Sequence, residues 1–161
     1  MSCEYVKVSW TDVIEAFQDV ARQLKDNHFD CIVCIGRGGM IPARLMSEYL
    51  NIRDIHFIPT RYVGDGDNKK VTIRDEHYDF SHMEEKSILV VDEIYTTGKS
   101  ISEIYNYIFD NANEVEITNC VGWLNEKSPR KPDVWSKLYN GETQWIVFPW
   151  EYTLTGEINE N

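Results

Sequence analysis

The chain has 161 residues, 42% of them hydrophobic and 27% charged, which predicts one globular domain over residues 1–161 and excludes disordered, collagen-like and coiled-coil proteins. The 27 acidic residues outnumber the 16 basic ones, and the resulting net charge of −11 disfavours nucleic acid and anionic membranes as partners. No run approaches the length of a membrane span, and the first twelve residues carry no secretory signal, so we expect a cytoplasmic protein.

Helix and strand patterns alternate from residue 9 onward. Ser9 can cap a helix, and the apolar residues over 10–24 recur at the spacing of one helix face. The apolar run 31–35 predicts a buried strand, 36–39 a sharp turn, and 42–50 a second helix with proline in its first turn. The apolar stripe of the first helix consists of Trp10, Val13, Ile14, Phe17, Val20, Ala21 and Leu24.

Two of the four cysteines, Cys31 and Cys34, form a C-x-x-C pair inside the first predicted strand. A zinc or redox site would need a second pair of ligands or an exposed helix start. Residues three apart on a strand point to opposite faces, so we expect two small core thiols, reduced as in the cytoplasm. The four histidines show no metal-ligand spacing.

Further strands are predicted over 55–58, 87–91, 115–124 and 144–148, and a helix follows the turn at 96–100. This alternation predicts an α/β fold with an open, mainly parallel sheet flanked by helices. Ligands bind beyond the carboxyl ends of the strands in such sheets, and both glycine-bearing turns lie at that edge.

Residues 62–83 are polar and alternate only weakly through Val71 and Ile73. They form either a surface hairpin with a flexible tip or a lid over the ligand edge. The spacing alone favours the hairpin.

The turn 96–100, Thr-Thr-Gly-Lys-Ser, is typical of a phosphate cradle. Amides at a helix start carry roughly half a positive charge, and the hydroxyls and lysine add to it. A Walker A loop would need glycine in place of Glu93, and a dinucleotide fingerprint would need glycine in place of Ile41. Just before the turn, Asp92 and Glu93 either are exposed turn residues or need compensation from a ribose diol or Mg²⁺.

Three segments then resemble one family. Residues 90–100, Val-Val-Asp-Glu-Ile-Tyr-Thr-Thr-Gly-Lys-Ser, resemble the phosphoribosyl-diphosphate (PRPP) signature of type I phosphoribosyltransferases. Residues 35–42, Ile-Gly-Arg-Gly-Gly-Met-Ile-Pro, resemble the family's pyrophosphate loop, especially in its xanthine–guanine branch. Residues 145–151, Trp-Ile-Val-Phe-Pro-Trp-Glu, resemble that branch's C-terminal hood, expected here over 125–153. The motifs keep the family's order.

The resemblance implies transfer of ribose 5-phosphate from PRPP to a 6-oxopurine, with release of pyrophosphate, by a homodimer that uses Mg²⁺. Asp92 and Glu93 would hold the ribose hydroxyls, directly or through the metal, and form the catalytic set with Arg37. The 5-phosphate would be held by Thr96, Thr97, Gly98, Lys99 and Ser100. The pyrophosphate would be held by Gly36, Arg37, Gly38, Gly39 and Lys69.

The same resemblance implies a strained or cis peptide at Gly36–Arg37 and a mobile catalytic loop over 62–83, from which Lys70 and Arg74 could also reach the diphosphate. For the base, it implies three contacts, which would be made by Lys127, Trp145 and Ile146.

Two of these base contacts have an alternative interpretation. Lys131 is a rival to Lys127, Trp145 could equally be a core residue, and Trp150 is expected to pack rather than to contact the base.

Two departures from the family pattern affect the choice of substrate. The second acidic residue is Glu93 rather than the commoner aspartate, and Thr96 stands where 6-oxopurine enzymes usually carry an aspartate near N7 of the base. A threonine hydroxyl cannot act as a general base near neutral pH. Either another group or solvent takes the proton, or the enzyme is a phosphoribosyltransferase for another base. A non-catalytic regulator that binds PRPP or a nucleotide is a further alternative, because the family resemblance includes such members.

Overall fold

The computed structural model describes residues 3–64, 70–74 and 79–152, and its main element is a six-stranded sheet in the order β4-β3-β2-β5-β6-β7. Five strands are parallel, and β4 pairs antiparallel at one edge, so the predicted mainly parallel α/β sheet is confirmed. The strands are β2 (Cys31–Gly36), β3 (Ile55–Val63), β4 (Lys70–Ile73), β5 (Ser87–Tyr95), β6 (Glu116–Asn125) and β7 (Val134–Tyr139).

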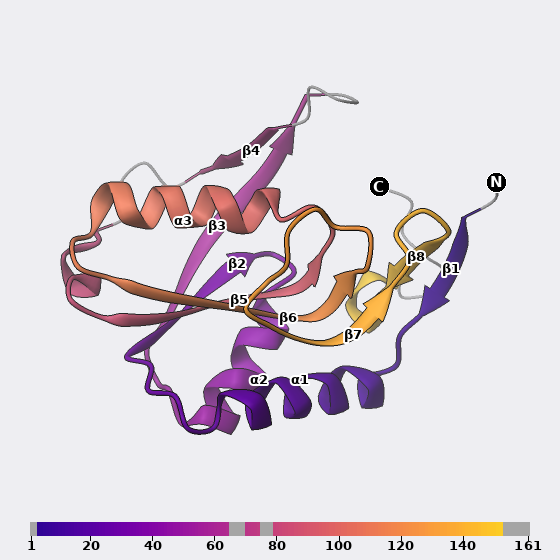
Figure 1. The fold of residues 1–161 in the computed structure, drawn as a ribbon, viewed down its shortest axis with the longest axis horizontal. Coiled ribbons are helices and arrows are strands. Elements are labelled where there is room, and N and C mark those ends of the chain that lie inside the picture. The colour runs from indigo at the N-terminus through magenta and orange to yellow at the C-terminus, as the bar shows by residue number, and fades with distance from the viewer. Residues whose placement is uncertain (1–2, 65–69, 75–78, 153–161) are drawn as a thin grey trace.

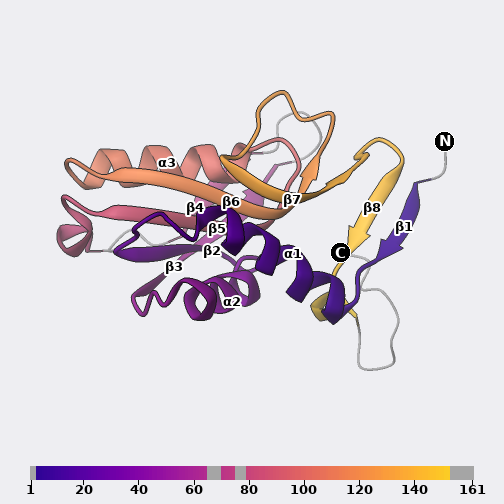
Figure 2. The ribbon, with the colours of Figure 1, turned by 60° about the horizontal axis from the view of Figure 1, so that its bottom comes forward.

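Helices cover both faces of this sheet (Figures 1 and 2). On one face lie α1 (Trp10–Leu24) and α2 (Met40–Leu50), and on the other lies α3 (Lys99–Asn111). Each face has its own apolar core, because β2 and β5 are buried on both sides. No helix in the described ranges is long and apolar enough to cross a membrane.

The start of α1 follows the sequence prediction closely. The Ser9 hydroxyl accepts the Asp12 N–H at 3.1 Å, and the Asp12 carboxylate accepts the Ser9 N–H at 2.8 Å, which completes a capping box. The predicted stripe is buried except for Trp10 and Ile14, which are 52% and 40% exposed. Trp10 instead lies beside the ring of Trp150, with centroids 5.8 Å apart.

The two strand cysteines are core thiols, as predicted. Cys34 packs in the core under α1 and α2, and Cys31 packs in the core under α3. Both are free thiols, and burial raises the pKa of Cys31 to about 11 and that of Cys34 to about 12. Neither is therefore a reactive thiolate near neutral pH.

A second, two-stranded sheet stands apart from the main one (Figure 1). It pairs β1 (Glu4–Lys7) in parallel with β8 (Gln144–Val147), so that Tyr5 lies opposite Trp145. The 3-10 helix η3 (Pro149–Glu151) follows β8. We call β1, β8 and η3 the hood; β7, which lies within the predicted hood segment 125–153, belongs instead to the main sheet. The sequence analysis predicted β8 but predicted neither β1 nor β7.

The carboxyl-terminal half of β3 forms an antiparallel ribbon with β4, which we call the ribbon. Thr60 pairs with Ile73 and Tyr62 with Val71, so this part of the 62–83 segment is the hairpin that its spacing favoured. The lid interpretation stays a prediction, and residues 65–69 and 75–78 lie outside the described residues.

Candidate active site

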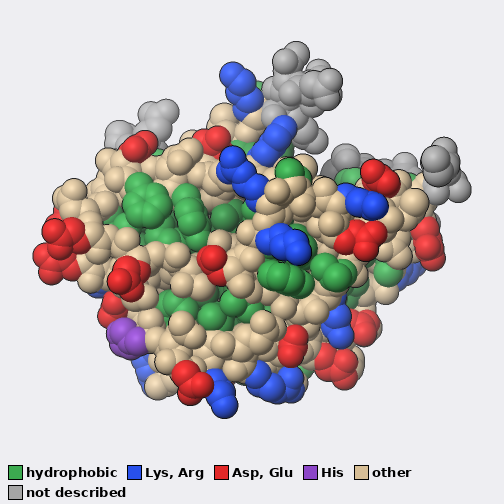
Figure 3. Space-filling view, in the orientation of Figure 1, with side chains coloured by type: hydrophobic (Ala, Val, Ile, Leu, Met, Phe, Trp, Pro, Cys, Tyr) green, Lys and Arg blue, Asp and Glu red, His purple; other side chains and the backbone are tan. Residues whose placement is uncertain are grey.

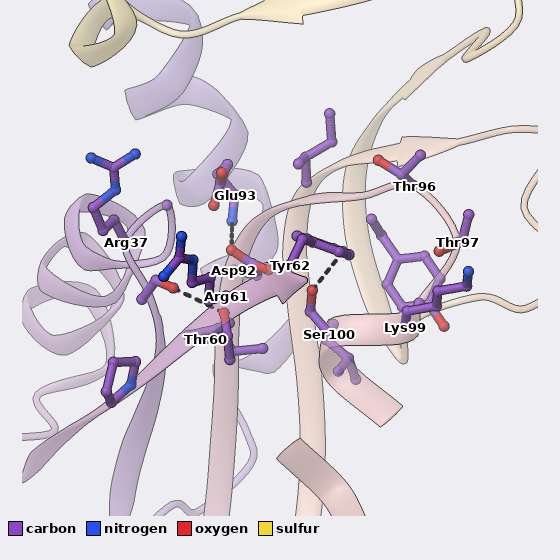
Figure 4. A pocket seen from close by; sticks show the side chains of 18 of the residues that line it. Arg37, Thr60, Arg61, Tyr62, Asp92, Glu93, Thr96, Thr97, Lys99 and Ser100 are labelled. Atoms are coloured by element: carbon purple, nitrogen blue, oxygen red, sulfur yellow. Dashed lines mark hydrogen bonds between the residues drawn. The ribbon is translucent and has the colours of Figure 1, made fainter. Parts of the chain in front are cut away.

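A cavity of about 910 Å³ opens at the carboxyl ends of β2 and β5, where parallel sheets place their ligands. Its size suits a small-molecule ligand. The two glycine-bearing turns and the base of the ribbon line it (Figure 4), and the hood lines it as well. Segments from residue 35 to residue 151 therefore meet in one place.

The predicted phosphate turn forms one end of the cavity, and all five of its residues line the wall. Gly98 caps α3 with a φ of 78°, a left-handed conformation that favours glycine. Within the described part of the chain this 13-residue helix has no side-chain cap hydrogen bond at Gly98, and its first intrahelical bond runs from the Ser102 N–H to the Gly98 carbonyl at 2.9 Å. The amides of Lys99, Ser100 and Ile101 therefore have no acceptor within the helix, and amides at such a position bind anions.

Two hydroxyls of this turn are hydrogen-bonded to tyrosines. Ser100 Oγ lies 2.8 Å from the Tyr62 hydroxyl on the ribbon, and Thr96 Oγ1 lies 3.0 Å from the Tyr139 hydroxyl on β7. Burial raises the pKa of Tyr139, so its hydroxyl stays protonated. Asn125 Nδ2 also donates to the Thr96 carbonyl at 3.3 Å. The phosphate turn is thus fixed from both sides of the cavity.

The acidic pair lies between the two turns (Figure 4). The Glu93 N–H donates to Asp92 Oδ1 at 3.0 Å, and the Glu93 carboxylate lies against Gly38, where it fills the space of a Cβ atom. Burial, and then the charge of Glu93, raise the pKa of Asp92 well above its ordinary value. Among the described residues, no cation pairs with either carboxylate.

These two carboxylates fit a magnesium ion. No cluster of three or more His, Cys, Asp or Glu within the described ranges could hold a metal on protein ligands alone. Mg²⁺ needs only one or two carboxylates, because substrate phosphates and water complete its shell. The Glu93 Oε2 atom is buried and has no hydrogen-bond partner in the described part of the chain, so a hard cation would satisfy it.

The second glycine-bearing turn follows β2 and carries the cis peptide bond Gly36–Arg37 that the family resemblance implied. Gly36, Arg37 and Gly38 line the cavity. Gly39 does not, and its N–H donates to the Ile35 carbonyl at 2.9 Å, so this amide is already used within the turn. Lys69, also predicted to bind pyrophosphate, lies outside the described residues.

The ribbon brings two further arginines to the cavity, Arg61 and Arg74. Arg74 is one of the two ribbon cations expected to reach the diphosphate, whereas sequence reasoning missed Arg61. Arg61 lies between Thr60 and Tyr62 on one strand, so the alternation of side chains along that strand is the signal that could have identified it.

The hood supplies the opposite wall. Trp145 lines the cavity and is 60% exposed, so it is not a core residue, and Val147 lies beside it. Trp150 packs against the hood, because its ring stacks on Phe148 with centroids 4.9 Å apart. It also lines the cavity. The carboxylate of Glu151, also in the wall, accepts the Phe148 N–H at 2.7 Å, and burial raises its pKa.

The other two predicted base contacts are not part of the cavity wall. Ile146 is buried and pairs with Val6 in the hood sheet. Lys127 is exposed, and its rival Lys131 lies over the ring of Trp135 at 5.6 Å from the ring centre. Contacts from Lys127 or from the Ile146 backbone stay predictions.

Residues 7–156 match the model of the phosphoribosyl transferase domain family. The chain belongs to this family. It is 26% identical over 159 residues to a xanthine-guanine phosphoribosyltransferase of Ruegeria sp. (strain TM1040), covering 91% of this chain and 85% of that protein. Among solved structures, it resembles a purine phosphoribosyltransferase from Pyrococcus horikoshii Ot3, with a TM-score of 0.78 and 26% identity over 92% of this chain and 95% of that one.

A shorter match is to a protein named as a transcriptional regulator. The phosphoribosyltransferase chain is 28% identical over 98 residues to Transcriptional regulator GfcR of Methanococcus maripaludis (strain C5 / ATCC BAA-1333). This match covers 61% of the present chain and 47% of the regulator.

Proposed function

We propose that this phosphoribosyltransferase transfers ribose 5-phosphate from PRPP to a 6-oxopurine (hypoxanthine, guanine or xanthine) and releases pyrophosphate. One observation carries the proposal: a single cavity holds an anion-binding helix start, an uncompensated carboxylate pair and an arginine-bearing turn. The names of the xanthine-guanine and purine relatives support a purine acceptor. A cytoplasmic homodimer remains a prediction.

The transfer is a displacement at the anomeric carbon with an oxocarbenium-like transition state. It requires that PRPP be held at both ends while the sugar between them develops positive charge. In our proposal the start of α3 holds the 5-phosphate, Asp92 and Glu93 hold the ribose hydroxyls, and Arg37 draws negative charge onto the leaving diphosphate. Mg²⁺, when bound by Asp92 and Glu93, would neutralise charge on that diphosphate.

The acceptor base would lie between the sugar and the hood. Trp145 offers an open aromatic face to a flat purine, and the Ile146 backbone would contact the edge of the ring. Thr96 cannot take the proton that the base loses, and its hydroxyl is already bonded to Tyr139. The proton must therefore pass to another group or to solvent, unless the acceptor is a different base.

The test is pyrophosphate release from PRPP and Mg²⁺ with hypoxanthine, guanine, xanthine, adenine, uracil and orotate in turn. Release with a 6-oxopurine is the expected result. Release with only another base would keep the reaction and replace the substrate. Repeating the assay without Mg²⁺ tests the metal, because the uncompensated carboxylate pair predicts a large loss of rate.

A non-catalytic PRPP-binding regulator is the second candidate, and the similarity to GfcR favours it. It predicts that PRPP binds while no base in the panel releases pyrophosphate. Calorimetric titration with PRPP, run beside the release assay, separates the two functions.

A further inference from the structure

Asn125, the last residue of β6, connects two parts of the site although it does not line the cavity. Its Nδ2 atom donates to the Thr96 carbonyl in the phosphate turn at 3.3 Å. Its Oδ1 atom accepts the Gly141 N–H at 3.0 Å and the Lys127 N–H at 3.1 Å. One half-buried side chain therefore joins the phosphate turn to the chain that leads into the hood.

The connection 140–143 is a hydrogen-bonded turn that carries this link on to β8. The Asn140 carbonyl accepts the Gln144 N–H at 2.8 Å. The Gln144 side chain in return accepts the Asn140 N–H at 2.9 Å. Trp145 follows Gln144 directly, so one turn separates the wall expected to receive the base from the Asn125 side chain.

The two ends of β8 are anchored in different ways. Just beyond its last residue, Phe148 is buried, and its ring meets the ring of Trp123 on β6 edge to face with centroids 5.1 Å apart. Near its first residue, Trp145 is 60% exposed, and Figure 3 shows acidic and basic side chains over the surface at this end of the molecule. The position of Trp145 therefore depends on the placement of its backbone, to which the Asn125 link contributes.

Gly141 fits closely against the Asn125 side chain. A Cβ atom at position 141 would lie 2.5 Å from Asn125 Nδ2 and 2.8 Å from Asn125 Cγ. The φ angle of Gly141 is outside the left-handed region, so alanine suits this backbone. Gly141→Ala should therefore push the Asn125 side chain away from Thr96, and the link can be broken from either partner.

We propose that Asn125 is a positioning residue that fixes the spacing between the phosphate turn and the Trp145 wall, so that a nucleotide contacts both at once. This inference rests on the proposed function, because the nucleotide is the product that it assigns. A ligand held at one end gains affinity from the other end only when the second site lies within its reach. Loss of Asn125 should therefore weaken ligands that span both ends more than ligands that occupy one.

The test is calorimetric titration with two ligands that differ in their span. Inosine 5′-monophosphate would reach both ends, and ribose 5-phosphate would occupy the phosphate turn alone. Asn125→Ala should weaken binding of the nucleotide by about fivefold or more and should leave the affinity for ribose 5-phosphate within about twofold. Damage to the phosphate turn itself would weaken both ligands, because both need that turn.

Asn111→Ala is the matched control. The Asn111 Nδ2 atom also donates to a backbone carbonyl, that of Tyr107 at 2.8 Å. It lies at the end of α3, outside the cavity wall, so both affinities should stay within about twofold of the parent protein. Thermal melting checks that each variant folds.

Gly141→Ala provides an independent second variant. It should reproduce the selective loss of nucleotide affinity seen in Asn125→Ala. The double variant should lose no more than Asn125→Ala alone, because the second substitution breaks a link that is already absent. Two losses that add in full would show that the substitutions act separately, which overturns the inference.

Hydrogen exchange tests the link without a base and without catalysis. Saturation of the parent protein with ribose 5-phosphate should slow amide exchange in residues 96–100 and, through Asn125, in residues 140–147. In Asn125→Ala the slowing should be confined to 96–100. Slowing that is confined to 96–100 in the parent, or that reaches 140–147 equally in the variant, overturns the inference.

The failure of this inference can be told apart from the failure of the proposed function. Exchange in 140–147 that depends on Asn125, without transfer to any base, supports the inference and refutes the transferase. Transfer in the parent, together with equal losses of affinity for the two ligands in Asn125→Ala, supports the transferase and refutes the inference. A parent protein that binds neither ligand refutes both.

Discussion

Replacing Asp92 by asparagine should stabilise the protein while it inactivates the site. Asp92 Oδ1 accepts the Glu93 N–H at 3.0 Å, and an asparagine oxygen can accept the same bond. The substitution therefore removes little besides the charge. That charge is partly buried beside Glu93, with no cation paired to it among the described residues. Stability sacrificed for ligand binding is common at active sites.

The size of the gain follows from this environment. Removing a carboxylate from water without a compensating cation costs about 1–3 kcal/mol, so Asp92→Asn should raise the free energy of unfolding by about that amount at pH 7. For a domain of this size, 1 kcal/mol corresponds to roughly 2–4 °C in Tm. The expected increase in Tm is therefore about 2–12 °C.

The pH dependence gives the sign of the effect independently. The pKa of Asp92 is raised in the folded protein, so the folded state binds this proton more tightly than the unfolded state does. The contribution of protonated Asp92 to stability is complete below its pKa in the unfolded state. It is lost as the pH rises through its pKa in the folded state. The advantage of Asp92→Asn should thus be smallest in acid and should grow towards neutral pH.

Urea unfolding from pH 4 to pH 8 measures this difference, and pyrophosphate release measures the activity, which should fall at least a hundredfold. Asp26→Asn removes the same charge from an exposed turn and controls for net charge. A variant less stable than the parent at pH 7, or a stability difference that does not change with pH, would refute the reasoning.

Three other substitutions test the site. Arg37→Ala should lower pyrophosphate-dependent turnover tenfold or more with an unchanged melting curve, because Arg37 is exposed; unchanged turnover would exclude its turn from the mechanism. Gly38→Ala should weaken PRPP binding with little change in urea unfolding, since the new methyl group displaces only the end of the Glu93 side chain; parent-like PRPP affinity would contradict that contact. Thr96→Asp should raise kcat with hypoxanthine, because the Tyr139 hydroxyl can donate to the new carboxylate; no gain would indicate another proton acceptor.

The elements that the sequence predicted are those with a strong local pattern. The capped apolar stripe of α1 and the continuous apolar run of β2 each indicate their structure within a few residues. The strands β1 and β7 lack such a pattern: three of the four β1 residues are exposed, and β7 has no clean alternation of buried and exposed positions. Their pairing is decided by distant partners, which a local pattern does not contain.

The same distinction applies to the site. The turns at 36–39 and 96–100 are contiguous motifs, so local sequence is enough to predict that they bind at the same sheet edge. Arg61 is outside both motifs and reaches the cavity through the pairing of the ribbon. Lys127 and Lys131 lie in a connection without a regular pattern, and neither lines the cavity.

The parallel pairing of β1 with β8 has a consequence for synthesis on the ribosome. Residues 4–7 are made near the start of synthesis, and their partners at 144–147 are made 140 residues later. The main sheet needs no residue beyond Tyr139, so it can assemble while β1 is still unpaired. Trp145 and η3 then arrive together with β8. The wall expected to receive the base is therefore completed last, and a chain cut short after β7 would lack it.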